Sequence, residues 1–224
     1  MSMAGIEFAF FFPLVFLLHW LGPRQRGWQN GALLVASVAF YATWNPRMLA
    51  VLAAAVALSF CAALWLGGVR TDDLEGATLA KAKRDRKRIL VVALVAQLGL
   101  LGVFKYADFF VDSLNGLLLT AGVTNALPLL RLALPLGISY TTLIQVGYLL
   151  EVYWERTPPC RDPLAYGAFV AFFPQLMAGP IVRARAMLPQ YEQARRFKPE
   201  DLSAGALAFV VGFTLKAFVA DWLA

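Results

Sequence analysis

The chain has 224 residues, of which 60% are hydrophobic and 15% charged, and its mean hydropathy is +0.64. Soluble domains carry about 45–50% apolar and about 25% charged residues, so this composition excludes an ordinary soluble globular protein. It also excludes an intrinsically disordered chain, which would contain few large apolar residues. We therefore expect an all-α, polytopic integral membrane protein: a multi-helix bundle that includes short or re-entrant helices.

Eight apolar stretches follow one another along the chain. They cover residues 6–21, 31–45, 48–69, 89–104, 107–123, 127–150, 164–182 and 204–224. A helix that crosses a membrane needs about 20 mostly apolar residues, so each stretch is a candidate membrane helix. Turn-forming pairs separate several of them, at Gly22-Pro23, Asn45-Pro46, Gly67-Gly68 and Pro158-Pro159.

The net charge of +6 is concentrated in residues 70–88 and 183–200, each of which has an excess of three positive charges. Loops that carry such an excess of Lys and Arg lie on the cytoplasmic side of membrane proteins. This pattern predicts a multi-pass protein of the bacterial cytoplasmic (inner) membrane with its N-terminus outside. No Lys or Arg precedes the first apolar stretch, so we expect that stretch to be a membrane helix and not a cleaved signal peptide. No nucleic-acid partner is expected.

Two stretches contain residues that interrupt a straight membrane helix. Residues 107–123 include Asp112, and residues 164–182 include Pro174, Gly179 and Pro180. Backbone that is not helical is tolerated at membrane depth only where protein or a water-filled cavity satisfies it. Because residues 183–200 are predicted to be cytoplasmic, we expect residues 164–182 to form a re-entrant element.

Few side chains are candidates for acid–base or metal chemistry. His19 is the only histidine, and its position beside Trp20 favours a packing or interfacial role over that of a general base. No metal site is expected from one histidine and two distant cysteines. Cys61 is expected to be shielded in an apolar run, whereas Cys160 is expected to be wet in a polar loop.

Several charged residues lie in or near the apolar stretches. Lys105, Asp108 and Asp112 share one face if they are helical, which suggests either a proton relay or, the favoured interpretation, a structural ion pair near the outer surface. Arg131 and the pair Lys216 and Asp221 raise the same question.

The stretch from Phe172 to Arg183 reads FFPQLMAGPIVR and combines helix breakers with polar groups. Its candidate substrate-channel residues are Pro174, Gln175, Gly179, Pro180 and Arg183. The prolines free backbone groups from helical hydrogen bonds, and the Arg183 guanidinium could hold a phosphate or carboxylate. A plain helix-breaking corner remains the alternative interpretation.

This stretch resembles the Phe-Pro-Gln/His-Leu-x-Ala-Gly-Pro-x-x-Arg motif of the membrane-bound O-acyltransferase family, in the branch of the alginate O-acetylation membrane proteins. Four further segments resemble motifs of the family in the same order: FKYADFF (104–110), LPLGISYTT (134–142), GYLLEVYW (147–154) and GFTLKAFVADWL (212–223). Glu151 stands where the family often has Asp, and Thr142 where an aromatic residue is common. Neither is a catalytic position of the family.

The resemblance implies that residues 1–224 are the N-terminal part of one O-acyltransferase domain. The functional histidines of the family lie in motifs that are absent here, so they are expected beyond Ala224, and His19 does not inherit their role. The apolar run that stops at Leu223-Ala224 without a polar flank also suggests a truncated chain. We expect the fragment alone to be inactive, with none of its own residues catalytic.

The whole enzyme is expected to transfer an acyl group, most simply acetyl, to an exported polysaccharide such as alginate. Its donor would be acetyl-CoA or another acyl thioester on the cytoplasmic side, used as a substrate, and no bound cofactor is expected. Membrane lipid, the polysaccharide acceptor and an extracytoplasmic acyltransferase are the implied partners. Two alternatives remain open: a membrane transporter or flippase, since broken helices also mark transport sites, and a non-catalytic membrane scaffold.

Overall fold

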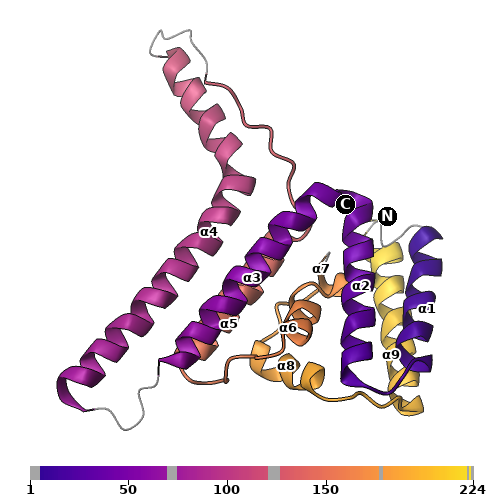
Figure 1. The fold of residues 1–224 in the computed structure, drawn as a ribbon. Coiled ribbons are helices and arrows are strands. Elements are labelled where there is room, and N and C mark those ends of the chain that lie inside the picture. Colours follow the sequence, from indigo (N-terminus) through magenta and orange to yellow (C-terminus); the bar gives the residue numbers. More distant parts are fainter. Residues whose placement is uncertain (1–5, 70–74, 121–126, 177–178, 221, 223–224) are drawn as a thin grey trace. The chain divides into compact units, whose positions relative to one another are not determined.

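The computed structural model describes residues 6–69, 75–120, 127–176, 179–220 and 222. Every regular element in these ranges is helical (Figure 1), which confirms the all-α class. The helices are α1 (Ile6–Leu21), α2 (Arg26–Trp44), α3 (Pro46–Gly68), α4 (Gly76–Thr120), α5 (Ile138–Tyr153), α6 (Pro163–Val170), α7 (Phe173–Leu176), α8 (Ala184–Glu192) and α9 (Pro199–Thr214). The chain forms two compact units, Met1–Ala194 and Arg195–Ala224.

The first three helices run up and down with short connections (Figure 1). Asn45 ends α2 and caps α3, because its Oδ1 accepts a hydrogen bond of 3.0 Å from the backbone N–H of Arg47. Pro46 occupies the first turn of α3, where its missing N–H costs no hydrogen bond. The Asn-Pro pair thus stops one helix and starts the next.

The fourth helix differs from the prediction. The expected helix 89–104, the described part of the expected helix 107–123 and most of the basic segment before them form one helix of 45 residues, about 67 Å long at 1.5 Å per residue. The described residues of α4 include no proline, and the charged residues at the predicted break are satisfied from outside the helix. Lys105 Nζ lies 3.2 Å from Ser139 Oγ, and Asp108 Oδ1 accepts the N–H of Leu130 at 2.7 Å.

Residues 127–137 are not helical, although they were predicted to be. Pro128 and Pro135 disfavour the helical conformation at the residues before them, and α5 begins only after Gly137, whose φ is +63°. This non-helical segment runs back along α4. The Asn115 side chain accepts the N–H of Leu127 at 2.7 Å and donates to its carbonyl oxygen at 3.0 Å. Residues 127–130 are thereby held along the last part of α4.

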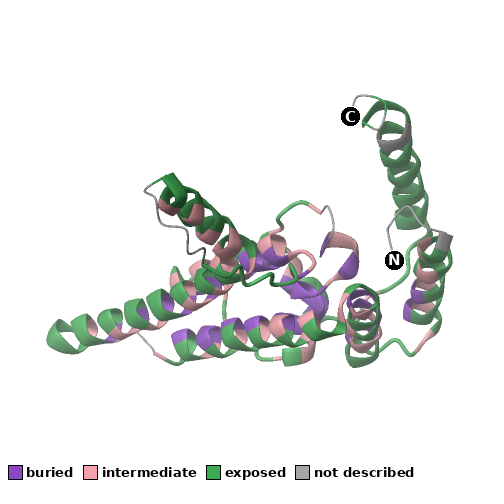
Figure 2. Cartoon of the chain, turned by 90° about the horizontal axis from the view of Figure 1, so that it is seen from above, coloured by how far each residue is buried: buried purple, intermediate pink, exposed green. Residues whose placement is uncertain are grey.

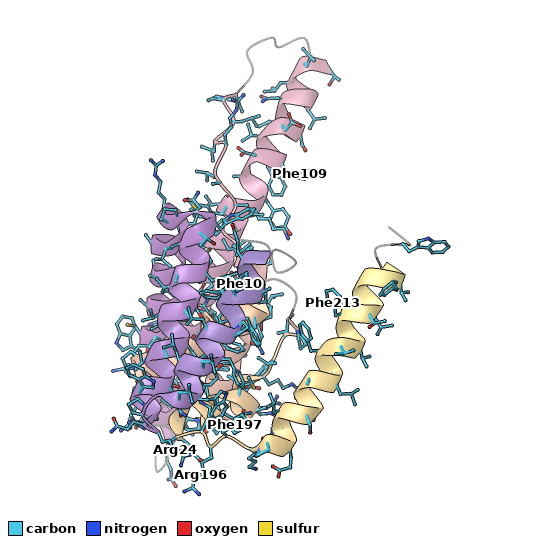
Figure 3. The ribbon with its side chains drawn as sticks, turned by 90° about the vertical axis from the view of Figure 1, so that its right-hand side faces the viewer. Phe10, Arg24, Phe109, Arg196, Phe197 and Phe213 are labelled. Atoms are coloured by element: carbon cyan, nitrogen blue, oxygen red, sulfur yellow. The ribbon has the colours of Figure 1, made fainter. Side chains whose placement is uncertain are left out.

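One end of the first unit gathers basic residues, and we name it the basic end. It carries Arg24 before α2, Arg26 at the start of α2, Arg86 on α4 and Arg185 on α8. Contacts link these positions, since Arg26 Nη1 lies 3.5 Å from the carbonyl oxygen of Glu192 and Arg86 Nη2 lies 2.8 Å from that of Tyr153. Figure 3 shows Arg24 at this end and Phe109, on the projecting part of α4, at the opposite end.

Three helical segments are long and apolar enough to cross a membrane: Pro46–Gly68, Gly76–Thr120 and Pro199–Ala220. The chain is therefore a multi-pass membrane protein. The third of these segments consists of α9 and a π-helical turn, Leu215–Ala220, and α9 has no buried residue (Figure 2). It starts five residues before the predicted stretch 204–224. The Lys216 side chain and Asp221 lie outside the described part of the chain.

Candidate functional site

The predicted re-entrant element begins and ends at the same end of the helix bundle, beside the last turns of α5. Before it, the backbone N–H of Cys160 donates to the Tyr148 hydroxyl at 2.8 Å, and after it the N–H of Arg185 donates to the Glu151 carboxylate at 3.0 Å. Tyr148 and Glu151 are less than one turn apart on α5, close to the basic end. The chain between them, α6 and α7 included, therefore departs from this end and returns to it.

The start of the element follows from its sequence. The Asp162 carboxylate accepts hydrogen bonds from the N–H groups of Leu164 and Ala165, at 2.9 and 3.3 Å, and Pro163 occupies the first turn of α6. These are the capping preferences of helix N-termini. Every residue of α6 from Ala165 to Val170 is buried, so this short helix lies within the bundle.

The tip of the element lies near the opposite end of the bundle. Leu176 of α7 packs in a cluster with Tyr41 and Leu52, which flank the α2–α3 connection. It also lies beside Gly137 at the start of α5, where an added Cβ would come within 2.7 Å of the Leu176 carbonyl oxygen. Gly137 and Glu151 are 14 residues apart on α5, which is about 21 Å along a helix. The element thus reaches through most of a hydrocarbon core about 30 Å thick.

The structure brings Gln175, Gly179 and Pro180 together around Tyr140. The Tyr140 hydroxyl donates to Gln175 Oε1 at 2.9 Å and lies 3.4 Å from the carbonyl oxygen of Pro180. Gly179 donates its N–H to the Gln175 carbonyl at 3.1 Å, and a Cβ at Gly179 would come within 2.8 Å of Gln175 Cα. Three of the five predicted channel residues therefore form one polar corner. Tyr140 lies in a segment that carries the family resemblance but was not predicted as a site residue.

The other two predicted residues lie on either side of this corner. Pro174 is half-buried in α7, next to Phe173, whose N–H lies 3.2 Å from Ser37 Oγ on α2. Arg183 is exposed and precedes α8, and its carbonyl accepts the N–H groups of Ala186 and Met187. Arg183 therefore lies on the return path toward the basic end and not at the tip.

The return path from Gly179 to Arg183 has no helical structure. Among the described residues, no hydrogen-bond partner is seen for the N–H groups of Ile181 and Val182. Ile181 is 59% exposed. Irregular backbone at membrane depth needs protein or a water-filled cavity around it, so this path is the part of the first unit best suited to line a cavity.

Four polar side chains that the sequence interpretation missed hold α6 against three other helices. Gln145 Oε1 accepts hydrogen bonds from Ser59 Oγ at 2.7 Å and from Gln97 Nε2 at 3.0 Å. The Tyr166 hydroxyl of α6 donates to Ser59 Oγ at 2.8 Å, and all four residues are buried. Each is an isolated polar residue in an apolar stretch, which is a signal that the sequence did contain.

Arg86 is a second residue whose role the sequence did not reveal. It lies in the basic segment but is only 6% exposed. Its guanidinium pairs with Glu155 at 2.6 Å and donates to the carbonyl oxygens of Val152 and Tyr153 at the end of α5. A charge counted as part of a solvated loop thus joins α4 to the last turn of α5.

The expectation that the Cys160 thiol is wet was wrong. Cys160 is 2% exposed, with its Sγ 3.4 Å from the Asp162 carbonyl oxygen, and burial raises the pKa of its thiol. Cys61 is exposed on the surface of α3, within a segment long enough to cross the membrane. The polar sequence around Cys160 folds back on α5, which removes the thiol from water.

The remaining candidates that the structure describes are His19, Lys105, Asp108, Asp112 and Arg131. His19 is buried, with its ring packed edge-to-face on Trp20 at 4.9 Å. The described residues contain no ion pair between Lys105 and Asp108, which instead bind the segment that leads into α5. Arg131 is exposed, with a φ of +49°. Within the described ranges, no group of three His, Cys, Asp or Glu side chains could hold a metal ion.

Comparison with known proteins gives curated relatives along the whole chain. "Probable alginate O-acetylase AlgI" of Azotobacter vinelandii is 36% identical over 216 residues, 96% of this chain and 40% of that protein. The chain is a relative of the membrane-bound O-acyltransferases. The protein of the same name from Pseudomonas aeruginosa is 36% identical over 228 residues, 100% of this chain and 41% of that protein.

A more distant relative is "peptidoglycan O-acetyltransferase" of Helicobacter pylori, which is 31% identical over 216 residues, 84% of this chain and 38% of that protein. These relatives confirm the resemblance drawn from the five ordered motifs. The chain spans about two fifths of the length of the curated relatives it matches. No family model and no solved structure matches it.

Proposed function

We propose that residues 1–224 are the N-terminal part of a membrane-bound O-acyltransferase. The complete enzyme would move an acetyl group from a cytoplasmic thioester to a hydroxyl group of an exported polysaccharide. The observation that carries the proposal is the re-entrant element in a chain whose relatives are named O-acetylases. Its return path offers irregular backbone between the Tyr140–Gln175 corner and the basic end.

The donor would approach from the basic end, which the positive-inside rule assigns to the cytoplasm. Acetyl-CoA carries several phosphates, and a guanidinium holds phosphate oxygens in two-pronged fashion. Arg183 is exposed at the start of α8 and lies on the path between this end and the polar corner. We assign to Arg183 the first contact with the anionic part of the donor.

The reaction needs a base that these residues do not supply. The acceptor hydroxyl attacks the thioester carbonyl, the C–S bond breaks, and the proton of the hydroxyl passes through the base to the leaving thiolate. The family resemblance implies a histidine beyond Ala224 as that base or relay. Pro174, Gln175, Gly179, Pro180 and Arg183 would form part of the channel wall that leads the donor to it. An extracytoplasmic acyltransferase would complete delivery to the polymer.

The test uses the full-length enzyme in lipid vesicles, with acetyl-CoA added on the side of the membrane that carries the basic end. We expect thiol release that depends on the added donor and falls at least tenfold in Gln175→Ala, which removes the acceptor of the Tyr140 hydroxyl. Gln190→Ala is the matched control. Gln190 is exposed on α8, and the hydrogen bonds seen for its side chain among the described residues go to Ala186 and Met187 of the same helix.

Equal rates for these two variants at equal expression would remove the polar corner from the site. Movement of an intact solute across the vesicle, without thiol release, would instead support the transporter alternative. Binding of a partner with neither activity would support the scaffold.

A further inference from the structure

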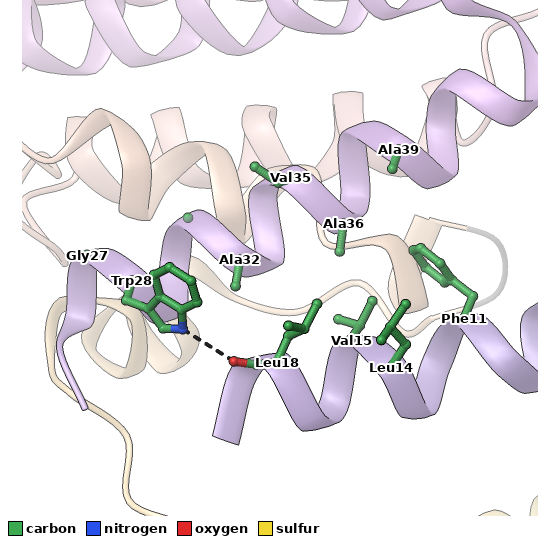
Figure 4. A pocket seen from close by; sticks show the side chains of 11 residues that line it. Phe11, Leu14, Val15, Leu18, Gly27, Trp28, Ala32, Val35, Ala36 and Ala39 are labelled. Atoms are coloured by element: carbon green, nitrogen blue, oxygen red, sulfur yellow. Dashed lines mark hydrogen bonds between the residues drawn. The ribbon is translucent and has the colours of Figure 1, made fainter. Parts of the chain in front are cut away.

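A second feature of the first unit, separate from the re-entrant element, is an apolar groove between α1 and α2 (Figure 4). Its volume is about 470 Å³, and its walls are Phe11, Leu14, Val15 and Leu18 on α1 and Gly27, Trp28, Gly31, Ala32, Val35, Ala36 and Ala39 on α2. Such a volume is within the range of ligand sites in proteins.

The groove forms because most of the residues that α2 presents to α1 are small, and the side chains of α1 do not fill the space above them. A Cβ added at Gly27 or Gly31 meets nothing within 4 Å. Small residues at this spacing usually allow close helix packing in membranes, yet here the space stays open along the helix. Trp28 narrows the groove near one end, where its Nε1 donates to the Leu18 carbonyl oxygen at 3.3 Å (Figure 4).

The length of the groove matches one leaflet of a bilayer. Its residues run from Gly27 to Ala39, 12 positions along α2, or about 18 Å. Half of a hydrocarbon core of about 30 Å is about 15 Å. The groove therefore begins at the basic end and reaches the middle of the membrane, as an acyl chain of that leaflet does.

The charge at the Gly27 end of the groove also selects an occupant. Arg24 and Arg26 are exposed one turn or less before Gly27, and neither forms an ion pair with a described residue. The one polar contact of Arg26 is with the Glu192 carbonyl oxygen, at 3.5 Å. Two guanidinium groups at the membrane surface attract an anionic headgroup, and an indole such as that of Trp28 favours the same interface.

We propose that this groove binds an anionic glycerophospholipid of the leaflet at the basic end. One acyl chain fills the groove between α1 and α2, and the headgroup phosphate lies on Arg24 and Arg26. The apolar walls, the leaflet-matched length and two arginines that form no ion pair with a described residue each support this occupant. The site is independent of the proposed acyl transfer, because the re-entrant element contributes none of its walls.

The test uses photoactivatable phospholipids with a diazirine in one acyl chain and either a phosphatidylglycerol or a phosphatidylcholine headgroup. The full-length protein is reconstituted with each lipid, irradiated and digested, and the labelled peptides are identified by mass spectrometry. We expect labels within residues 11–39, with phosphatidylglycerol favoured at least fivefold, since each arginine near an anionic headgroup contributes about fivefold in affinity.

Two kinds of variant separate the chain from the headgroup. Gly31→Leu and Ala32→Leu each place a side chain in the groove and should reduce labelling by both lipids. Arg24→Gln with Arg26→Gln should remove the headgroup preference and leave the labelled positions unchanged. Arg47→Gln is the matched control and should change neither, because Arg47 is exposed in the first turn of α3, beyond the far end of α2.

Two results would overturn the proposal: labels that avoid residues 11–39 in the wild-type protein, or a headgroup preference that survives the double arginine substitution. Because the arginine variants leave the walls of the groove intact, they keep the test decisive if a groove-filling variant fails to fold.

Discussion

The carboxylate of Glu151 accepts a 3.0 Å hydrogen bond from the backbone N–H of Arg185, and the Arg185 Nε lies 3.9 Å from the other carboxylate oxygen. This contact joins the end of α5 to the start of α8, so it closes the re-entrant element at the point where the chain returns. Glu151 is 8% exposed, whereas half of the Arg185 side chain is exposed. The bond to the backbone is therefore the sheltered part of the interaction.

Replacing Glu151 by alanine should loosen this closure. A hydrogen bond to a charged group contributes about 1.5–3 kcal/mol, so Glu151→Ala should lower the stability of the protein by that amount. Glu151→Gln keeps an acceptor for the Arg185 N–H and should lose less. Thermal unfolding in detergent measures both, with Asp112→Asn, an exposed carboxylate on α4, as the control. Equal stability of Glu151→Ala and Asp112→Asn would show that the contact contributes nothing.

The buried amide of Gln145 should be the most sensitive position of the polar network. Gln145→Leu removes three hydrogen bonds, those that its Oε1 accepts from Ser59 and Gln97 and the one that its Nε2 donates to the Thr141 carbonyl, at about 1 kcal/mol each. Ser59 Oγ and Gln97 Nε2 both keep the Ala55 carbonyl oxygen as an acceptor. Tyr166→Phe removes only one bond and should cost about 1 kcal/mol. The same unfolding assay ranks the variants. Gln190→Leu, at an exposed position of α8, should be nearly neutral. The reverse ranking of Gln145→Leu and Tyr166→Phe would contradict the network.

Two glycines of the α5 region provide a matched pair. Gly137 has a φ of +63°, and a Cβ there would come within 2.7 Å of the Leu176 carbonyl oxygen, whereas a Cβ at Gly147 meets nothing within 4 Å. The left-handed conformation alone costs a residue with a Cβ about 1–2 kcal/mol. Gly137→Ala should therefore destabilise the protein and displace the tip of the re-entrant element. Gly147→Ala should be neutral or stabilising, because alanine favours helix. Similar melting temperatures for the two variants would refute the strain at Gly137.

The native cysteines predict a labelling pattern that depends on pH. Burial raises the pKa of the Cys160 thiol above its usual 9.0, so the reactive thiolate is scarcer at neutral pH than for a free cysteine and increases as the pH rises. A membrane-impermeant maleimide should therefore label Cys160 slowly in opened membranes at pH 7 and faster at alkaline pH. Cys61 faces the lipid of a membrane span and should stay unlabelled.

The positive control for this experiment is Arg161→Cys in a chain without the native cysteines. Arg161 is exposed and adjacent to Cys160, so the new thiol should react rapidly, and only after the membrane is opened. Rapid labelling of native Cys160 at pH 7 would contradict its burial. Labelling of Arg161→Cys in intact spheroplasts would contradict the assignment of the basic end to the cytoplasm.

Arg183 should affect donor use more than Arg161, which lies on the same predicted side of the membrane. If Arg183 contacts the phosphates of the donor, Arg183→Ala should raise the KM of the full-length enzyme for acetyl-CoA by about 10-fold, equivalent to about 1.4 kcal/mol. Arg161→Ala is the control, since a single exposed charge away from the path contributes little. A KM that is unchanged in Arg183→Ala, with a reduced amount of folded protein, would assign this residue a structural role.

Features that depend on local sequence were predictable. Composition alone gave the membrane class, and the prolines and glycine between Pro174 and Pro180 predicted a break in the helix and a re-entrant path. The Asn45-Pro46 pair predicted the end of α2 and the start of α3. Each of these signals acts through the backbone of adjacent residues, which is why a single sequence contains it.

The tertiary structure decided what depends on partners far along the chain. The sequence suggested a break in α4 at Lys105 and Asp108, but Ser139 and Leu130 satisfy these charges and the helix continues. The polar loop around Cys160 suggested a wet thiol, but the bond to the Tyr148 hydroxyl folds it against α5. Membrane composition, helix ends and the re-entrant break were thus determined by sequence. Burial and polar pairing were decided only when the fold brought distant residues together, because the cost of a buried polar group depends on its partner and not on its neighbours in the chain.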